Sequence, residues 1–155
     1  MKHVHEEKFD AAPARLFEIL HTPSAIRAWW GASRVIVMPA QGGVWAATWG
    51  EDEDDPDYIT TARMSVFDPP RRIVMTDYAY RSKEGPLPFD AQFTTEFLVE
   101  ADDDGAILRV TQDGFPETAE GREFLDACDK GWRDTFAGIR AFLKRTGTAR
   151  SPGGE

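Results

Sequence analysis

Apolar residues recur at helical spacing over the last part of the chain. At 100° per residue, one narrow stripe within residues 119–146 contains Leu125, Cys128, Trp132, Phe136, Ile139 and Leu143. The opposite face carries residues of opposite charge four positions apart, such as Asp129 and Arg133, which are typical of a solvated surface. The pattern predicts a long helix, ended by Gly147, that buries one face against the rest of the protein.

Two glycines, Gly131 and Gly138, lie along one edge of this stripe. In a helix interior, each costs about 1 kcal/mol of helix propensity relative to alanine. Such a cost is tolerated where another segment must come close to the helix backbone. We therefore expect both glycines to face strands that pack against this edge of the helix.

Before the helix, apolar and polar residues alternate with the period of strands. The clearest case is a strand in which Phe93, Thr95 and Phe97 share one side. The alternation predicts strands at residues 1–9, 35–38, 44–50, 58–67, 72–80, 92–100 and 106–113. Because the connections are short and contain no crossover helices, they favour an antiparallel sheet of about seven strands in an α+β fold.

Two short helices are expected between the first and second strands, at residues 13–21 and 24–30. Both segments have amphipathic spacing. Asp10 and Ser24 stand at the start of these segments, where side chains of this kind cap the first backbone N–H groups. We expect these two residues to be the helix caps.

The composition narrows the class of protein. Its 155 residues are the length of one domain, which we assign to residues 1–147, with residues 148–155 as a flexible C-terminal tail. A net charge of −9 argues against nucleic acid as a partner, since phosphates would be repelled. The chain shows neither a signal peptide nor an apolar run of about 20 residues that could span a membrane. The single Cys128 excludes an internal disulfide, and these features together predict a cytoplasmic protein.

Strand alternation also places polar side chains among apolar ones. Gln112 shares a face with Val110, and Asp77 shares a face with Met75. We therefore expect an amide and a carboxylate to border the interior between sheet and helix. A few polar groups among apolar walls are typical of a small-molecule site. A buried Asp77 could serve as a general base there, because burial disfavours its charged form.

Aromatic residues supply the walls of this expected site. The 5 Trp and 10 Phe are many for this length, and such side chains either fill a core or line an apolar cavity. The residues expected to contact a ligand are Trp30, Trp45, Trp49, Asp77, Phe93, Thr95, Phe97, Gln112, Trp132 and Phe136. Composition alone does not decide between a filled core and a cavity.

Two segments carry residues of the kind that bind metals, but neither has a complete set of ligands. His3 and His5 share a face of the first strand with Glu7, and they would need a further ligand from elsewhere in the fold. Because no Cys or further His is near in sequence, an ordinary, partly exposed strand is the favoured interpretation. The acidic run at residues 51–57 lacks the glycine-bearing spacing of an EF-hand loop. The sequence therefore predicts no metal and no cofactor.

The order of several short motifs resembles one superfamily. They are Phe9-x-Ala11-x-Pro13, Trp29-Trp30, the Gly42-Gly43 turn, Asp68-Pro69-Pro70, the Gly114-Phe115-Pro116 corner and Gly131-Trp132 in the last helix. Over residues 4–143 the chain is similar to the START-related helix-grip superfamily (SRPBCC), in the branch homologous to the activator of the heat-shock-protein-ninety ATPase. The resemblance implies a curved antiparallel sheet that wraps around the long C-terminal helix. It also implies an apolar cavity between them, closed at one end by the two short helices.

The resemblance implies less about activity. Members of the superfamily bind lipids, hormones or polyketides, some act as cyclases or hydrolases, and the namesake co-chaperone stimulates an ATPase by protein contact. The branch shares no catalytic residue, and the chain shows no nucleophile motif, so we assign no catalytic residue.

Three hypotheses for the function follow. The first is a non-catalytic or weakly catalytic binding protein for an apolar or aromatic small molecule. The second is a cyclase- or hydrolase-type enzyme that uses Asp77 and Gln112, and the third is an interaction module that contacts a chaperone. A cavity of roughly 300–1,000 Å³ would support the first two hypotheses, and a filled core the third. The pattern leaves a homodimer open.

Overall fold

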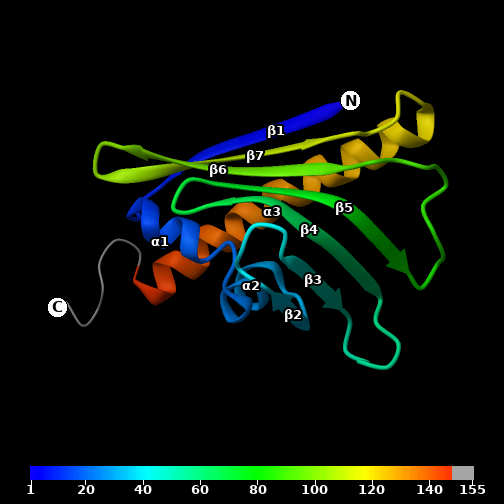
Figure 1. Ribbon diagram of the computed structural model, residues 1–155, viewed down its shortest axis with the longest axis horizontal. Coiled ribbons are helices and arrows are strands. Elements are labelled where there is room, and N and C mark those ends of the chain that lie inside the picture. The colour runs from blue at the N-terminus through cyan, green and yellow to red at the C-terminus, as the bar shows by residue number, and fades with distance from the viewer. Residues whose placement is uncertain (148–155) are drawn as a thin grey trace.

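Seven antiparallel strands form one sheet that curves around the long helix α3 (Ala119–Thr146), as Figure 1 shows. The structure is a computed structural model that describes residues 1–147, and the predicted tail at residues 148–155 lies outside the described residues. Two short helices, α1 (Pro13–Glu18) and α2 (Pro23–Trp30), follow the first strand. The strands are β1 (Lys2–Phe9), β2 (Arg34–Val37), β3 (Val44–Trp49), β4 (Tyr58–Asp68), β5 (Arg72–Ser82), β6 (Thr94–Asp102) and β7 (Gly105–Asp113). This arrangement confirms the predicted α+β helix-grip fold.

The strand order β1-β7-β6-β5-β4-β3-β2 makes a meander from β2 to β7, to which β1 adds at the far edge. In the pairing of β1 with β7, His3 lies opposite Gln112 and Phe9 lies opposite Ala106. The first and the last strand are thus neighbours in space. Residues about 100 positions apart in the sequence therefore meet at this edge of the sheet.

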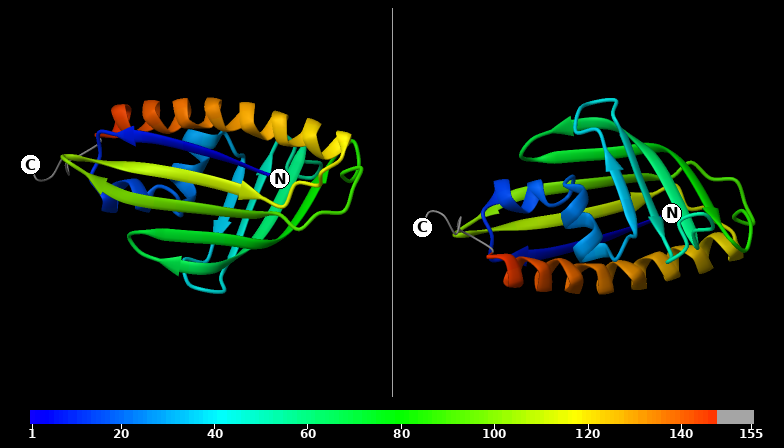
Figure 2. Two further views of the ribbon diagram at one scale, coloured as in Figure 1. Left: turned by 90° about the horizontal axis from the view of Figure 1, so that it is seen from above. Right: turned by 90° about the horizontal axis from the view of Figure 1, so that it is seen from below.

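Helix α3 lies along the concave face of the sheet and runs beside β1 in both views of Figure 2. Most of the predicted stripe is buried, namely Leu125, Trp132, Phe136, Ile139 and Leu143. The exception, Cys128, is only partly buried. At the start of the helix, the side chain of Thr118 accepts a hydrogen bond from the backbone N–H of Gly121, which caps an otherwise free donor.

The predicted caps of the two short helices are wrong. Ala12 and Thr22 occupy the N-cap positions of α1 and α2, and neither makes a capping hydrogen bond through its side chain. Helix α1 begins at Pro13, the predicted first residue, and α2 begins at Pro23. Because proline lacks a backbone N–H and already has a helical φ angle, it removes one of the donors that a cap would have to satisfy.

The two glycines of α3 differ, and the prediction that both face strands is wrong. A Cβ atom at Gly138 would lie 2.5 Å from the backbone oxygen of Trp29, so this glycine permits close packing of α2, not of a strand. A Cβ atom at Gly131 would have no neighbour within 4 Å, because this residue is on the solvent side. Periodicity placed both glycines at the edge of the stripe, but only one edge position meets another helix.

Candidate functional site

A pocket with a volume of about 170 Å³ lies between the sheet and the N-terminal half of α3. Its walls come from α2, from strands β3 to β7, from α3 and from the loop between β5 and β6. The lining residues are Trp30, Trp45, Trp49, Thr60, Tyr78, Tyr80, Leu87, Phe93, Thr95, Gln112, Phe115, Phe124 and Cys128. Of the ten residues expected to contact a ligand, the pocket brings together Trp30, Trp45, Trp49, Phe93, Thr95 and Gln112.

One wall of the pocket is built from tryptophans around Trp30, the last residue of α2. The ring centroid of Trp30 lies 5.7 Å from that of Trp45 and 5.6 Å from that of Trp49. The indole N–H of Trp49 donates to the backbone oxygen of Trp30, with a distance of 3.3 Å between the atoms. The packing and the hydrogen bond hold the end of α2 against β3, so this wall is rigid.

The opposite wall consists of Phe93, which the sequence pattern assigned to the site, and of Phe115 and Phe124, which it did not. The ring of Phe115 lies 5.0 Å from Phe93 and 5.9 Å from Phe124, and Phe89 packs against both Phe93 and Phe124. Phe115 follows Gly114, whose φ of 100° turns the chain back toward the sheet. The Gly-Phe-Pro corner was therefore the sequence feature that could have identified Phe115 as a pocket residue, although it did not show where the Phe115 ring would point.

Three side chains from neighbouring strands form a polar strip on the floor of the pocket. The hydroxyl of Tyr78 donates to Thr95 Oγ1 at 2.6 Å, and Gln112 Nε2 donates to the same oxygen at 3.1 Å. On its other side, Gln112 Oε1 accepts a hydrogen bond from His3 Nε2 at 2.8 Å. Because each group is held by its neighbour, the amide of Gln112 has a defined orientation.

The ionisable groups that line the pocket are held in their neutral forms. Burial raises the pKa of the Tyr78 hydroxyl far above its usual range, and burial together with the nearby Tyr58 raises the pKa of Tyr80. Burial also raises the pKa of the Cys128 thiol to about 11. At neutral pH these groups keep their protons, so none of the three is poised to act as a base.

Asp77 does not border the pocket, and the expectation that it faces the interior is wrong. Strand β5 carries an extra residue opposite residues 61–63 of β4, which forms a β-bulge. At the bulge Asp77 adopts a φ of 55°, and its side chain is 73% exposed and lies 3.5 Å from the guanidinium of Arg63. Since the extra residue reverses the alternation, Tyr78 takes the inward position that was expected for the carboxylate.

Three of the expected residues, Phe97, Trp132 and Phe136, belong to the packed core and do not line the pocket. The ring of Trp132 lies 5.9 Å from Phe97 and 6.1 Å from Phe136. It also lies 5.2 Å from Trp30, so it supports the tryptophan wall from behind. The helical stripe predicted burial correctly, but burial alone does not distinguish a residue that faces a space from one that fills it.

Three of the six carboxylates in the acidic segment between β3 and β4 pair with basic side chains. The ammonium of Lys83 lies 3.2 Å from Asp57 and 3.4 Å from Asp55, and Arg34 pairs with Glu53. These contacts give the carboxylates cationic partners from the protein itself. They agree with the interpretation of this segment as a solvated hairpin tip.

The sequence of the chain matches one protein family over most of its length. The family described as "Activator of Hsp90 ATPase homolog 1-like protein" matches residues 10–144. The chain belongs to this family. The match confirms the resemblance drawn from the short motifs, but membership of a fold family does not by itself fix a function.

Solved structures with the same fold include several bacterial proteins. Protein MLL2253 from Mesorhizobium loti is 20% identical, with a TM-score of 0.75 over 94% of this chain and 98% of that one. Protein Ms6760 from Mycobacterium smegmatis is 17% identical, with a TM-score of 0.72 over 94% of this chain and 92% of the other. A solution structure of the Aha1 dimer from Colwellia psychrerythraea is 15% identical, with a TM-score of 0.67 over 90% and 93% of the two chains.

At these identities the similarity shows the fold alone. No curated protein has a sequence that matches this family member. In the part of the chain that the structure describes, no helix is both long and apolar enough to cross a membrane.

Proposed function

We propose that this protein binds a small apolar or monoaromatic molecule in the pocket beneath α3. The observation that carries the proposal is the contrast between two aromatic walls and one polar strip, formed by Tyr78, Thr95 and Gln112. Ligand sites in proteins commonly combine apolar walls with a few oriented polar groups. A uniformly apolar hole would bind with less orientation, because nothing would fix one end of the ligand.

The volume of the pocket sets the size of the ligand. About 170 Å³ is below the roughly 300–1,000 Å³ of sites for drug-sized molecules, so the pocket is smaller than the cavity on which the sequence-based hypotheses of binding and catalysis depended. An engineered apolar cavity of about 150 Å³ in another protein accepts benzene. We therefore expect one ring with a short substituent, such as phenol or a small aromatic ketone, and not a lipid or a polyketide.

The polar strip favours a ligand with one oxygen substituent. Gln112 uses one amide hydrogen for Thr95 and accepts from His3 through its oxygen, which leaves its second amide hydrogen free to donate. The Tyr78 oxygen, which donates its proton to Thr95, can still accept a hydrogen bond. A hydroxyl or carbonyl group on the ring would satisfy one of these free positions.

Tryptophan fluorescence offers a direct test, because Trp30, Trp45 and Trp49 all line the pocket. Titration with phenol, a small aromatic ketone and naphthalene-based dyes should change the emission for the single-ring compounds and leave it unchanged for the larger dyes. Cys128→Phe should abolish the response by filling the space. Gly131→Ala, a change on the same helix but on its solvent side, should leave the response intact.

Two outcomes would count against the proposal. One is a silent titration with every single-ring probe at millimolar concentration. The other is a response that Cys128→Phe does not alter, since the probe would then be binding elsewhere. Native mass spectrometry of protein isolated from its own cells would complement the titration, because a retained molecule would identify the natural ligand.

The enzymatic alternative is less well supported than binding. Its proposed base, Asp77, is exposed on the outer side of the sheet and is paired with Arg63. Gln112 lines the pocket but is an amide, which does not accept a proton at neutral pH. A cyclase or hydrolase mechanism built on these two residues therefore lacks a base at the site.

Contact with another protein is a second candidate role, and exposed apolar side chains around β2 favour it. Ile36 is 66% exposed and Met38 is 58% exposed, and β2 is an edge strand with one unpaired side. Exposed apolar residues on an edge strand suit pairing with a second copy of the chain, and a structural relative is described as a dimer. Sedimentation velocity of the wild type and of Ile36→Lys should show a dimer that the variant disrupts; a wild-type monomer at high concentration would argue against it.

A further inference from the structure

Three side chains with metal-binding atoms converge where β1 runs beside α3. His3 and His5 point from β1 toward the helix, and Asp129 comes from the helix itself. One ligand atom from each lies within 4.8 Å of the others. The two imidazole rings are 5.1 Å apart at an angle of 67°. The histidine pair needs a further ligand, and Asp129 can provide it. Asp129 lies 124 positions after His5 in the sequence, and the fold brings the two residues together.

His3 is buried with one nitrogen left without a partner. The residue is only 7% exposed, and its Nε2 atom is used in the hydrogen bond to Gln112 Oε1 at 2.8 Å. Since this oxygen can only accept, Nε2 carries the proton and Nδ1 has a free lone pair. Nδ1 is buried and has no hydrogen-bond partner among the described residues. A buried lone pair without a partner is costly in a folded protein, unless something else binds there.

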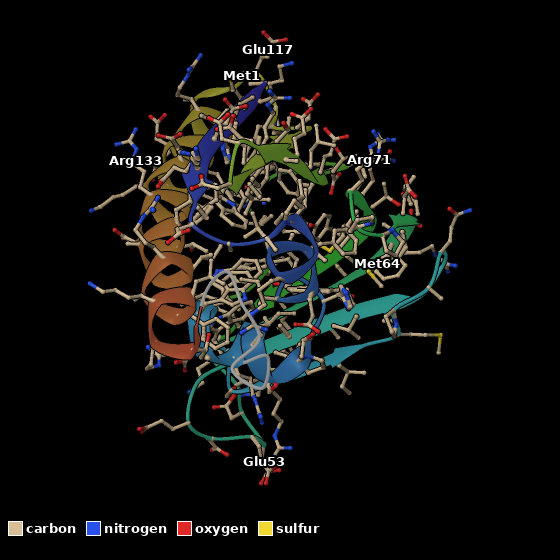
Figure 3. All side chains as sticks on the ribbon, turned by 90° about the vertical axis from the view of Figure 1, so that its left-hand side faces the viewer. Met1, Glu53, Met64, Arg71, Glu117 and Arg133 are labelled. Carbon is tan, nitrogen blue, oxygen red and sulfur yellow. The ribbon has the colours of Figure 1, made fainter. Side chains whose placement is uncertain are left out.

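His5 and Asp129 approach each other without forming a proper hydrogen bond. His5 Nε2 lies 2.8 Å from Asp129 Oδ1, yet no partner of this nitrogen meets the angular requirements of a hydrogen bond. The other carboxylate oxygen, Oδ2, accepts a hydrogen bond from Arg133 at 2.6 Å. In Figure 3 Arg133 projects from the outer side of α3, so it holds the carboxylate from the solvent side and leaves Oδ1 directed at the histidines.

We propose that His3 Nδ1, His5 Nε2 and Asp129 Oδ1 bind a divalent transition metal ion, for which Zn²⁺ is the best fit. Two imidazoles and one carboxylate are a set that zinc and non-haem iron use, whereas Ca²⁺ and Mg²⁺ prefer oxygen ligands only. Tetrahedral bonds of about 2.0–2.1 Å place ligand atoms about 3.3 Å apart. One ligand atom from each residue lies within 4.8 Å of the others, so binding would draw the three side chains closer together, with a water molecule as the fourth ligand.

The contacts around the three residues are those of a metal-binding site and favour this interpretation over a cluster that binds no ion. Metal-binding histidines commonly donate their second ring N–H to a carbonyl or carboxylate oxygen, which fixes the ring. Gln112 provides such an oxygen for His3. Because Gln112 also lines the pocket, the metal position and the pocket share one side chain.

Cobalt is a suitable probe because Co²⁺ at a four- or five-coordinate site absorbs visible light and is displaced by Zn²⁺. The full chain without a polyhistidine tag, first dialysed against a chelator, should take up one Co²⁺ per chain. Zn²⁺ should remove the absorption and raise the Tm. This experiment requires no pocket ligand, so its outcome is independent of the proposed function.

Variants distinguish the site from surface binding. His5→Ala and the isosteric Asp129→Asn should each abolish the Co²⁺ absorption, and the second keeps the shape of the side chain in case the first destabilises the fold. His21→Gln is the matched control, because His21 is the remaining histidine and packs against Phe17 and Phe67 at another place in the fold. The control should bind as the wild type does.

Gln112→Ala should weaken Zn²⁺ binding by about 10–100-fold without abolishing it, as expected for loss of a supporting hydrogen bond. The proposal is overturned if the wild type shows no Co²⁺ absorption and no Zn²⁺-dependent rise in Tm. It is also overturned if His5→Ala and Asp129→Asn bind the ion as well as the wild type, or if His21→Gln alone loses it.

Discussion

The two halves of α3 use the same apolar stripe in different ways. In the C-terminal half, Phe136, Ile139 and Leu143 are at most 1% exposed and are packed on all sides. In the N-terminal half, Phe124 and Cys128 are only partly buried and border the pocket, and Asp129 faces the two histidines. A uniform helical pattern therefore covers a dense core at one end and a site with space and unpaired polar atoms at the other.

The difference comes from what packs against each half. Helix α2 presses against the C-terminal half, where Gly138 allows the backbone of Trp29 to come close. The N-terminal half instead faces strands and the loop before β6, whose large rings leave gaps when they pack at angles. We infer that one half of the helix stabilises the fold and that the other half can vary to suit a ligand.

Removing a side chain from the dense half should have the largest effect on stability. Ile139 is fully buried, so Ile139→Ala should lower the free energy of unfolding by about 2–5 kcal/mol. Cys128→Ala, in the half that borders the pocket, should lower it by about 1 kcal/mol or less, because it only enlarges an existing space. Urea unfolding monitored by circular dichroism measures both values. Equal losses would mean that the two halves do not differ in packing.

The reactivity of Cys128 measures how exposed the pocket is in the N-terminal half of α3. Because burial raises the pKa of Cys128 from 9.0 to about 11, the thiolate fraction at pH 8 should be about 100-fold lower than for a free thiol. The rate of alkylation by iodoacetamide should fall by a similar factor. The same protein in urea provides the reference, since its thiol is then fully exposed. A native rate close to the unfolded rate would show that the pocket is open to water at this point.

A pair of glycine substitutions should give smaller effects of opposite sign. Gly131→Ala should raise the free energy of unfolding by about 1 kcal/mol through helix propensity, since no neighbour opposes the new methyl group. Gly138→Ala should lower it, because the added Cβ would lie 2.5 Å from the Trp29 backbone oxygen. Thermal unfolding compares the two variants directly. A stabilising Gly138→Ala would remove the argument that α2 requires this glycine.

The sequence predicted most of the fold because the fold depends on periodicity. Alternation found the seven strands, and helical spacing found α3 with its buried stripe, since both follow from the backbone geometry of one element at a time. The same reasoning failed at Asp77, where one additional residue in β5 reversed the alternation. A bulge depends on how two strands pair, and neither strand shows it alone.

The site was predicted only in part for a related reason. Trp45, Thr95 and Gln112 were found because inward-facing residues of a sheet can be counted along each strand. Phe115 and Phe124 were missed because a corner and a helix flank place their rings through tertiary contacts. Trp132 was assigned to the pocket, although its ring fills the space behind Trp30.

By itself, the sequence determined the order of the elements and the buried face of α3, since these are properties of residues close together in the chain, and it determined the family through the order of short motifs along the chain. Only the tertiary structure decided which half of the helix borders a space, and which polar atoms are left without partners. The meeting of His3 and His5 with Asp129 is the clearest case. It depends on β1 pairing with β7 beside the helix, a contact between segments about 100 residues apart in the sequence that no local pattern contains.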